Sequence, residues 1–334
     1  MNSLKKITAV VLALIMVIGL AACGNGSQNT GNNNNAAPAP TWPSANNVTV
    51  VVPAKAGGGN DQSARILTDY LARATGKNFI VDNDTTGGGT VAYEKVRNAK
   101  PDGNTFLIFS ANMVVSNLFG TYDHGVEDFT IIGIPAGAND QNAFVVPASA
   151  PYNTLQEFID YAKAHPGELK FGGQNAAVSM LFEASFCKAA GIELKFVEAG
   201  SQPDKITAIL GKHIDCADIT LNAADQYVKS GDMKILGVLQ DERSKTYSDY
   251  PTFTELGYKD AIVPQSGLIL GPKGMDKDTV KQISEYIKSA STDSTVIDSY
   301  KKMNSTLTYY TPSEAADNIN NMVKIMKAAH DNIK

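Results

Sequence analysis

Residues Val48 to Thr75 read VTVVVPAKAGGGNDQSARILTDYLARAT, and they are the most informative segment for the fold class. Its first residues, 48–52, are a run rich in β-branched side chains, which predicts a buried strand. From Ser63 to Thr75 the apolar side chains recur at helical spacing, which predicts an amphipathic helix. A glycine turn, Gly57 to Gly59, joins the two elements. The stretch therefore predicts one strand, one glycine-rich loop and one helix in that order.

The same alternation continues along the chain. Gly76 fits the C-terminal cap of the first helix, and further strands are expected at 79–81 and 105–109, with a helix at 91–99. A second series has expected helices at 154–164, 179–190, 204–210 and 223–229 and expected strands at 169–171, 194–197, 214–219 and 235–239. The tail, 276–334, is expected to be mainly helical. This order predicts an α/β fold of two lobes, each a mostly parallel sheet flanked by helices.

Glycine turns follow predicted strands at 57–59, 87–89 and 172–173. Glycine lets the backbone approach a ligand closely, and a helix that begins just after the turn offers unpaired N–H groups and the positive end of its dipole. These turns predict a site for a small carboxylate or phosphate at the carboxyl edges of the strands, between the two lobes. The alternative is that all of them are packing turns. Asp61 is placed to act as the N-cap of the first helix.

The N-terminus predicts export. Lys5 and Lys6 precede an uncharged run, 7–22, which is short for a bilayer span and typical of a signal peptide. The run ends in Leu20-Ala21-Ala22-Cys23, which resembles the bacterial lipobox, so Cys23 is expected to be acylated, with palmitate as one of its acyl chains; the alternative is a chance patch of small residues. The 18 uncharged residues that follow, 24–41, form a flexible tether of roughly 24 Å mean length. Trp42 is expected to pack against the folded body.

Composition excludes several classes of function. Removal of residues 1–22 leaves 312 residues and changes the net charge from −5 to −7, which argues against a nucleic-acid partner. Hydrophobic residues make up 43% of the chain, enough for a substantial core. Cys187 and Cys216 are too few for a disulfide scaffold and are not spaced like metal ligands, although a bridge between them stays open. We expect no metal and no cofactor.

The sequence shows no arrangement typical of a catalytic site. The four histidines, at 124, 165, 213 and 330, fall in loops or at the surface and not beside a nucleophile motif. Paired carboxylates such as Asp215 and Asp218 fit strand ends rather than acid and base groups. We therefore expect a binding protein and not an enzyme.

The order of several motifs resembles the Bug family, the extracytoplasmic solute-binding proteins of tripartite tricarboxylate transporters. The motifs that carry the resemblance are Val52-Pro53 with Gly57-Gly58, Asp61 and Arg65, then Pro101-Asp102-Gly103-x-Thr105, Glu127-Asp128-Phe129, Pro166-Gly167, Pro251-Thr252-x-x-Glu255-x-Gly257 and Gly271-Pro272-Lys273-Gly274. They span nearly the whole mature chain.

The resemblance implies a periplasmic-binding-protein-like fold of type II, a Venus flytrap whose lobes are joined by two crossing strands. The expected parts are a lipoprotein signal peptide at 1–22, the lipidated cysteine and tether at 23–44, lobe 1 at 45–145 with 262–334, and lobe 2 at 146–261. The expected partners are a small organic anion, either a carboxylate or an amino acid, and the membrane subunits of the transporter. We expect a monomer, lipid-anchored on the extracytoplasmic face of the cell membrane. A sensory binding protein and a secreted α/β enzyme are the alternatives.

The resemblance also points to the residues that hold the ligand, largely through backbone amides. In the family, the aspartate that matches Asp61 can face the amine of an amino-acid ligand. The expected ligand-binding residues are Lys55, Ala56, Gly57, Gly58, Gly59, Asn60, Asp61, Ser110, Asn112, Gly173, Gln174, Asn175, Ser179, Gly200, Ser201, Thr220 and Asn222. The chain departs from the family at 174–180 and at Val197-Glu198-Ala199-Gly200-Ser201, where the family has Val-Pro-Tyr-Lys-Gly. The lost aromatic and the gained hydroxyl and amide groups predict a more polar pocket.

Overall fold

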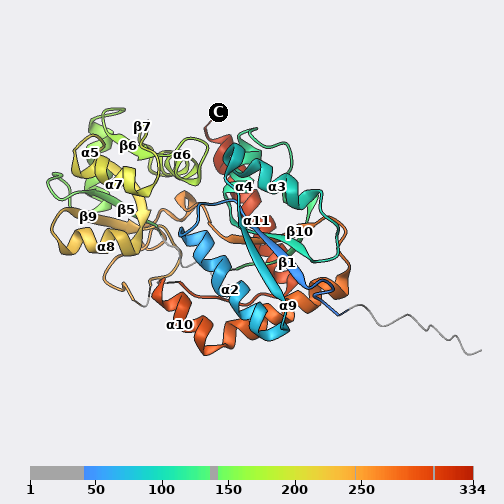
Figure 1. Ribbon diagram of the computed structural model, residues 1–334. Coiled ribbons are helices and arrows are strands. Elements are labelled where there is room, and N and C mark those ends of the chain that lie inside the picture. The colour runs from blue at the N-terminus through green and yellow to red at the C-terminus, as the bar shows by residue number, and fades with distance from the viewer. Residues whose placement is uncertain (1–40, 136–141, 245, 304, 334) are drawn as a thin grey trace, which may run out of the picture. The chain divides into compact units, whose positions relative to one another are not determined.

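The computed structural model describes residues 41–334 except 136–141, 245, 304 and 334. The signal peptide, Cys23 and the tether up to residue 40 lie outside the described residues. The described residues form two five-stranded sheets with helices against both faces of each (Figure 1). The prediction of a two-lobed α/β fold is therefore confirmed.

The first sheet has the strand order β2-β1-β3-β10-β4. Its strands are β1 (Asn47–Val52), β2 (Asn78–Asn83), β3 (Thr105–Ser110), β4 (Phe129–Gly133) and β10 (Gly267–Pro272). Only β10 runs antiparallel to its neighbours, so this sheet is mostly parallel, as expected. The helical elements of this lobe are α2 (Gly59–Thr75), η1 (Thr86–Gly89), α3 (Thr90–Arg97), α4 (Asn112–Leu118), η2 (Val126–Asp128), α9 (Lys277–Thr292), α10 (Ser294–Lys302) and α11 (Pro312–Asp331).

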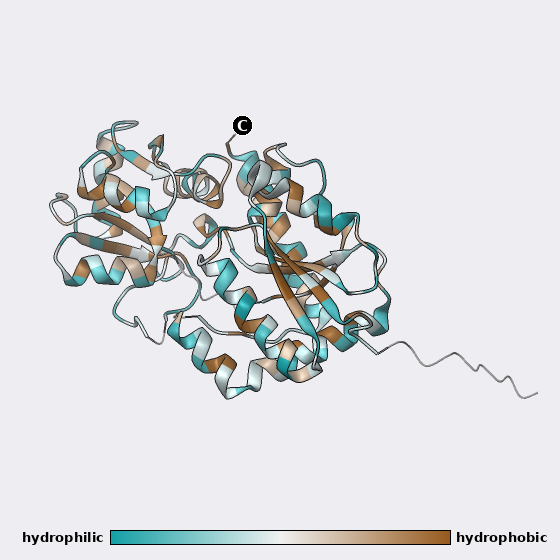
Figure 2. Ribbon diagram, viewed as in Figure 1, coloured by the Kyte–Doolittle hydropathy of each residue, from teal (hydrophilic) through white to brown (hydrophobic). Residues whose placement is uncertain are grey.

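Strand β1 is apolar at nearly every position because both faces of its sheet are covered. Val50 and Val52 pack with α2 and α9 on one face, whereas Val51 packs with α3 and α11 on the other. Successive side chains of a strand point to opposite faces, so only a strand buried on both sides needs an unbroken apolar run. Figure 2 shows the resulting hydrophobic strands at the centre of the lobe.

The second sheet repeats this arrangement, with the order β7-β6-β8-β5-β9 and only β5 antiparallel to its neighbours. Its strands are β5 (Asn142–Pro147), β6 (Lys170–Gly173), β7 (Lys195–Glu198), β8 (Cys216–Thr220) and β9 (Met233–Val238). The helical elements are α5 (Leu155–Ala164), α6 (Val178–Ala190), α7 (Gln202–Leu210), α8 (Leu221–Lys229) and η3 (Lys259–Ala261).

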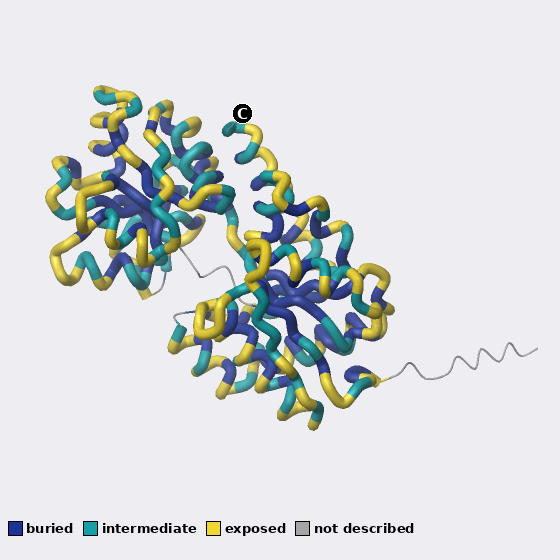
Figure 3. The backbone as a smooth tube through the Cα atoms, turned by 45° about the horizontal axis from the view of Figure 1, so that its top comes forward, coloured by how far each residue is buried: buried dark blue, intermediate teal, exposed yellow. Residues whose placement is uncertain are grey.

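An aromatic cluster fills the core between the second sheet and helices α5 and α6. The ring of Phe144 on β5 lies 5.0 Å from that of Phe158 and 5.3 Å from that of Phe186, measured between centroids. Phe182 and Phe186 on α6 are stacked, with 5.8 Å between their centroids. All of these side chains are buried, and Figure 3 shows the dark-blue strands that they cover.

The chain passes from one sheet to the other twice, between β4 and β5 and between β9 and β10. In each case the first strand after the passage is the antiparallel one. The predicted boundary between 145 and 146 falls inside β5, and that between 261 and 262 falls in the second passage. The lobe limits given above stay a prediction. Periodicity did not predict β4, β5, β10 or α4.

The last helix connects the two lobes. Helix α11 packs on β4 and α4 in the first lobe, and it also contacts α6 of the second. Lys188 Nζ on α6 donates a hydrogen bond to Asn332 Oδ1 at 2.7 Å, just after the end of α11. Buried side chains of both lobes accordingly belong to one continuous apolar cluster.

Trp42 packs against the folded body, as expected. Its ring is 4% exposed and lies 5.8 Å from the ring of Phe79 and 5.6 Å from that of Tyr286. Its indole N–H donates to the carbonyl of Gly103 at 2.9 Å. The part of the predicted tether from Trp42 onward is therefore part of the folded body.

Glu94 on α3 is the centre of an ion-pair network. Its carboxylate accepts from Arg97 at 2.7 and 2.8 Å and from the Tyr122 hydroxyl at 2.8 Å, and Asn98 also donates to it. The hydrogen bonds from Arg97, followed by those from Tyr122 and Asn98, outweigh burial and lower the pKa of Glu94 to about 2. The ordinary value is 4.5, so the folded state binds the proton less readily than the unfolded state.

Replacing Glu94 with glutamine is expected to flatten the acid dependence of stability. Because the folded pKa is the lower one, the network stabilises the protein above pH 4.5 and this contribution is lost as the pH falls towards 2. Urea unfolding between pH 5 and pH 2 should show a smaller loss for E94Q than for the wild type. The exposed Glu285→Gln variant is the control. Equal slopes for the wild type and E94Q would contradict the prediction.

Candidate functional site

The predicted ligand residues all lie where a strand ends and a helix begins. In the first lobe, 55–61 connect β1 to the first turn of α2, and Ser110 and Asn112 lie between β3 and α4. In the second, the residues lie at the last positions of β6 and β8 or in the segments that follow β6, β7 and β8. Strands β1 and β3 are parallel neighbours, as are β7, β6 and β8, so their carboxyl ends share an edge. The structure thus brings the predicted residues together in two groups, one on each sheet.

Four helices at these edges begin without a side-chain cap, whereas α7, which follows β7, has a capping box formed by Ser201 and Asp204. The N-cap residues of α2, α4, α6 and α8 are Gly58, Ala111, Ala177 and Thr220, and none of their side chains bonds to the helix. Helices elsewhere are capped: the side chains of Thr154, Asp276, Asp293 and Thr311 accept N–H groups of α5, α9, α10 and α11. Uncapped first turns leave N–H groups and a positive dipole end for an external anion.

Asp61 organises the loop between β1 and α2. It is 2% exposed and is the third residue of α2, so the prediction that it is the N-cap was wrong; Gly58 takes that place. Its Oδ2 accepts the Gly57 N–H at 2.7 Å and Arg65 Nε at 3.0 Å. Its Oδ1 accepts Asn83 Nδ2 at 3.0 Å and lies 3.0 Å from Arg65 Nη2.

The charge of Asp61 is therefore satisfied inside the protein. Burial acts to raise its pKa, but the hydrogen bonds from Arg65, the Gly57 N–H and Asn83 outweigh it, and the pKa is lowered. Asn83 also donates to the carbonyl of Ala54, which ties the loop to the neighbouring strand β2. Both carboxylate oxygens are occupied, so Asp61 shapes the loop rather than presenting a free acceptor to a ligand.

Only one glycine of the turn needs a left-handed backbone. Gly57 has φ +84°, a conformation that side chains with a Cβ rarely adopt, whereas Gly58 has φ −75°. A Cβ at Gly58 would lie 3.4 Å from the carbonyl of Lys55. The backbone therefore requires glycine at 57, whereas at 58 a Cβ would make only an ordinary contact. The side chain of Lys55 is exposed beside them.

In the second lobe the backbone donors of the loops are largely used internally. The Gln174 N–H donates to Ser179 Oγ at 2.9 Å, and the Thr220 N–H donates to Gln202 Oε1 at 2.9 Å. Both the N–H and the hydroxyl of Ser201 donate to Asp204. The side chain of Asn222 accepts from the Tyr247 hydroxyl at 3.0 Å. At this edge, the backbone N–H groups in the first turns of α6 and α8 remain for a ligand.

Glu198, which sequence reasoning did not single out, connects two of these loops. Its Oε2 accepts the Asn175 N–H at 2.5 Å, and its Oε1 accepts the Gly200 N–H at 3.0 Å. Glu198 stands where the family has a proline, and this difference was the sequence signal for an unusual residue in the loop. The difference alone does not show which groups the carboxylate contacts.

A buried ion pair that the sequence pattern also missed lies beneath the same loops. Lys205 Nζ contacts Asp218 Oδ1 at 2.6 Å and the Asp218 carbonyl at 3.1 Å, and the two side chains are only 9% and 4% exposed. Asn142 Nδ2 donates to Asp218 Oδ2 at 2.6 Å. Asn142 is the first residue of β5, so this network holds the strand that enters the lobe. The sequence signal for this buried pair was an aspartate, Asp218, within an otherwise apolar strand.

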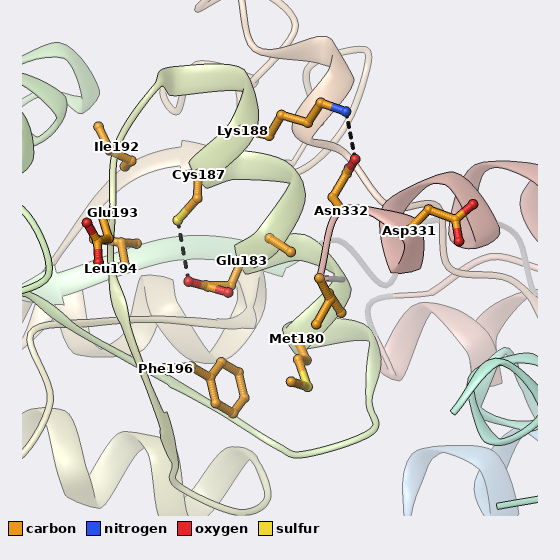
Figure 4. Close-up of a pocket in the computed structure, with 12 residues that line it drawn as sticks. Met180, Glu183, Cys187, Lys188, Ile192, Glu193, Leu194, Phe196, Asp331 and Asn332 are labelled. Carbon is orange, nitrogen blue, oxygen red and sulfur yellow. Dashed lines mark hydrogen bonds between the residues drawn. The ribbon is translucent and has the colours of Figure 1, made fainter. Parts of the chain in front are cut away.

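A cavity of about 760 Å³ is lined by side chains of α6, of residues 192–196 and of the C-terminal end of α11 (Figure 4). It contains none of the predicted ligand residues. Burial raises the pKa of Glu183, and Cys187 donates to this carboxyl group at 3.4 Å. Cys187 and Cys216 are free thiols, so the bridge left open by the sequence is not formed. The lining residues are Met180, Glu183, Ala184, Cys187, Lys188, Ile192, Glu193, Leu194, Phe196, Asp331, Asn332 and Ile333.

Residues 63–331 match the family model described as the tripartite tricarboxylate transporter family receptor. The chain belongs to this receptor family. A curated relative, Protein BugT of Bordetella pertussis, is 24% identical over 286 residues, which are 83% of this chain and 85% of BugT. The resemblance to the Bug family is thereby confirmed.

Two solved structures share the fold of this chain. A TctC solute-binding protein from Polaromonas has a TM-score of 0.74 and 25% identity, over 88% of this chain and 99% of that one. An R. palustris protein solved with adipate has a TM-score of 0.73 and 21% identity, over 87% and 98%. Membership in this receptor family is membership in a family of solute-binding proteins and not of enzymes. Among the described residues, no helix is both long and apolar enough to cross a membrane.

Proposed function

We propose that this receptor captures a small carboxylate outside the cytoplasm and delivers it to the membrane subunits of a tripartite tricarboxylate transporter. The observation that carries the proposal is the set of uncapped helix N-termini at the carboxyl edges of both sheets. A carboxylate is the ligand that such N–H groups and helix dipoles favour. No chemical conversion of the ligand is part of this role.

The contacts of Asp61 favour a carboxylate without an amino group. An α-ammonium group in a buried site needs acceptors, and both oxygens of Asp61 are already bonded to Arg65, Asn83 and the Gly57 N–H. The similar R. palustris protein holds adipate, a dicarboxylate. We propose that the ligand bridges the loops of the two lobes, with one carboxylate at the first turn of α2.

A thermal-shift screen of carboxylates and amino acids tests the proposal. A ligand that binds only the folded state should add about 2.7 kcal/mol of stability at a hundredfold excess over Kd. Dicarboxylates should outcompete their monocarboxylate analogues, because only they reach both lobes, and small-angle scattering should show a more compact protein when they bind. Absence of a shift with every carboxylate would contradict the proposed function.

The sequence Leu20-Ala21-Ala22-Cys23 supports lipid anchoring, which completes the proposal. Replacing Cys23 with serine is expected to move the protein from the membrane fraction to the soluble fraction. Two acyl chains anchor a protein stably, whereas a chain without them has no comparable membrane affinity. Fractionation with immunoblotting measures the change, and Cys187→Ser is the control. Membrane association of C23S equal to that of the wild type would contradict anchoring at Cys23.

A further inference from the structure

The carboxylate of Glu198 lies where a ligand carboxylate was expected. It accepts the N–H groups of Asn175 and Gly200, and both residues belong to the predicted ligand set. These two donors come from different loops, one after β6 and one after β7. One carboxylate that receives two backbone N–H groups from two loops is the same arrangement by which such loops hold an anionic ligand.

The position is open to solvent and well defined. Glu198 is exposed, and it is the last residue of β7, paired in register with Gly173 at the end of β6. Gly200 has φ +79°, a left-handed backbone conformation that glycine adopts readily. Because each oxygen of Glu198 has its own donor, the carboxylate is held at two points.

The charge around this position disfavours a second carboxylate. Asp204 lies on the next turn and accepts both donors of Ser201. The nearby ammonium group of Lys205 is committed to Asp218 and buried with it. A ligand carboxylate placed beside Glu198 would therefore meet negative charge and donors that are already occupied.

From these contacts we infer that Glu198 is a specificity-determining residue, which acts as a built-in carboxylate at the ligand edge of the second lobe. It fills the position formed by Asn175 and Gly200, so a ligand carboxylate is excluded from these two N–H groups and the lobe has one anion position fewer. The receptor consequently prefers dicarboxylates to tricarboxylates. This inference rests on the proposed function.

Calorimetry with succinate and tricarballylate on the wild type, E198Q and E198A tests the preference. The wild type should bind succinate more tightly, and both variants should reduce the ratio of the two affinities about tenfold, because they remove the resident charge. Asp215→Asn is the matched control. Asp215 also accepts a backbone N–H, that of Lys170 at 2.8 Å, but at the opposite end of the same sheet. An unchanged ratio in E198Q and E198A would overturn the inference.

Acetate titration of E198A, followed by amide NMR, gives a readout that does not depend on the natural ligand. The Asn175 and Gly200 resonances should shift and saturate with acetate in E198A and stay fixed in the wild type. If the wild type binds no carboxylate while these amides respond in E198A, the proposed function fails and the assignment of the amide pair stands. If the wild type binds succinate while E198A shows no acetate response, the inference is overturned and the proposed function stands.

Discussion

Replacing Asp218 with alanine is expected to reduce the free energy of unfolding by about 3–5 kcal/mol, because it leaves the ammonium group of Lys205 buried without a counter-charge. In the folded protein this pair is at 2.6 Å and both side chains are less than a tenth exposed. The change also removes the acceptor of Asn142 at the start of β5. Urea unfolding monitored by circular dichroism measures the effect.

The chain offers a matched control in the pair Lys229–Asp225. It has the same 2.6 Å separation in the same lobe, but Lys229 is 74% exposed and can be hydrated once its partner is gone. Asp225→Ala should therefore reduce stability by only about 1–2 kcal/mol, mostly through the lost hydrogen bond from Tyr250. Equal losses in D218A and D225A would contradict the prediction.

A double variant separates charge burial from loss of packing. Lys205→Met combined with Asp218→Leu removes both charges and keeps apolar volume, so it should be more stable than D218A alone. A double variant that is no more stable than D218A would mean that the contacts of Asn142 and the loop, rather than the isolated charge, account for the loss.

Replacing Asp61 with alanine is expected to reduce ligand affinity about a hundredfold. The variant leaves the Gly57 N–H, Arg65 and Asn83 without their shared acceptor, and the loss of such charged hydrogen bonds amounts to about 2–3 kcal/mol. The loop between β1 and α2 would then lose the conformation that presents its N–H groups. Calorimetry with the dicarboxylate identified by the thermal-shift screen measures the affinity.

Asp69→Ala is the control for this experiment, since Asp69 is an exposed carboxylate two turns further along the same helix. It should leave affinity unchanged. Asp61→Asn should bind nearly as poorly as D61A, because an amide presents N–H groups to the donors around it. Wild-type affinity in D61A would show that the ligand does not depend on this loop.

The site was only partly predictable. The loops that carry the predicted ligand residues follow from the local order of strand, glycine and helix, and the parallel pairing of β1 with β3 and of β7, β6 and β8 brings them together. Which groups in those loops are free was not predictable. Asp61 and Asn83 are 22 residues apart, Asn175 and Glu198 are 23 apart, and Asn142 and Asp218 are 76 apart. Hydrogen bonds over such separations leave no periodic pattern.

The α/β class, the strand β1, the helix α2 with its cap at Gly76, and the family could all be predicted from the sequence, because each depends on local side-chain periodicity or on short motifs. The antiparallel directions of β5 and β10 follow only from the tertiary structure. Strand pairing depends on which strands meet after the chain has passed between the lobes. The tertiary structure also decided the roles of Asp61, Glu198 and Asp218. A carboxylate acts according to the donors that surround it, and folding is what places those donors.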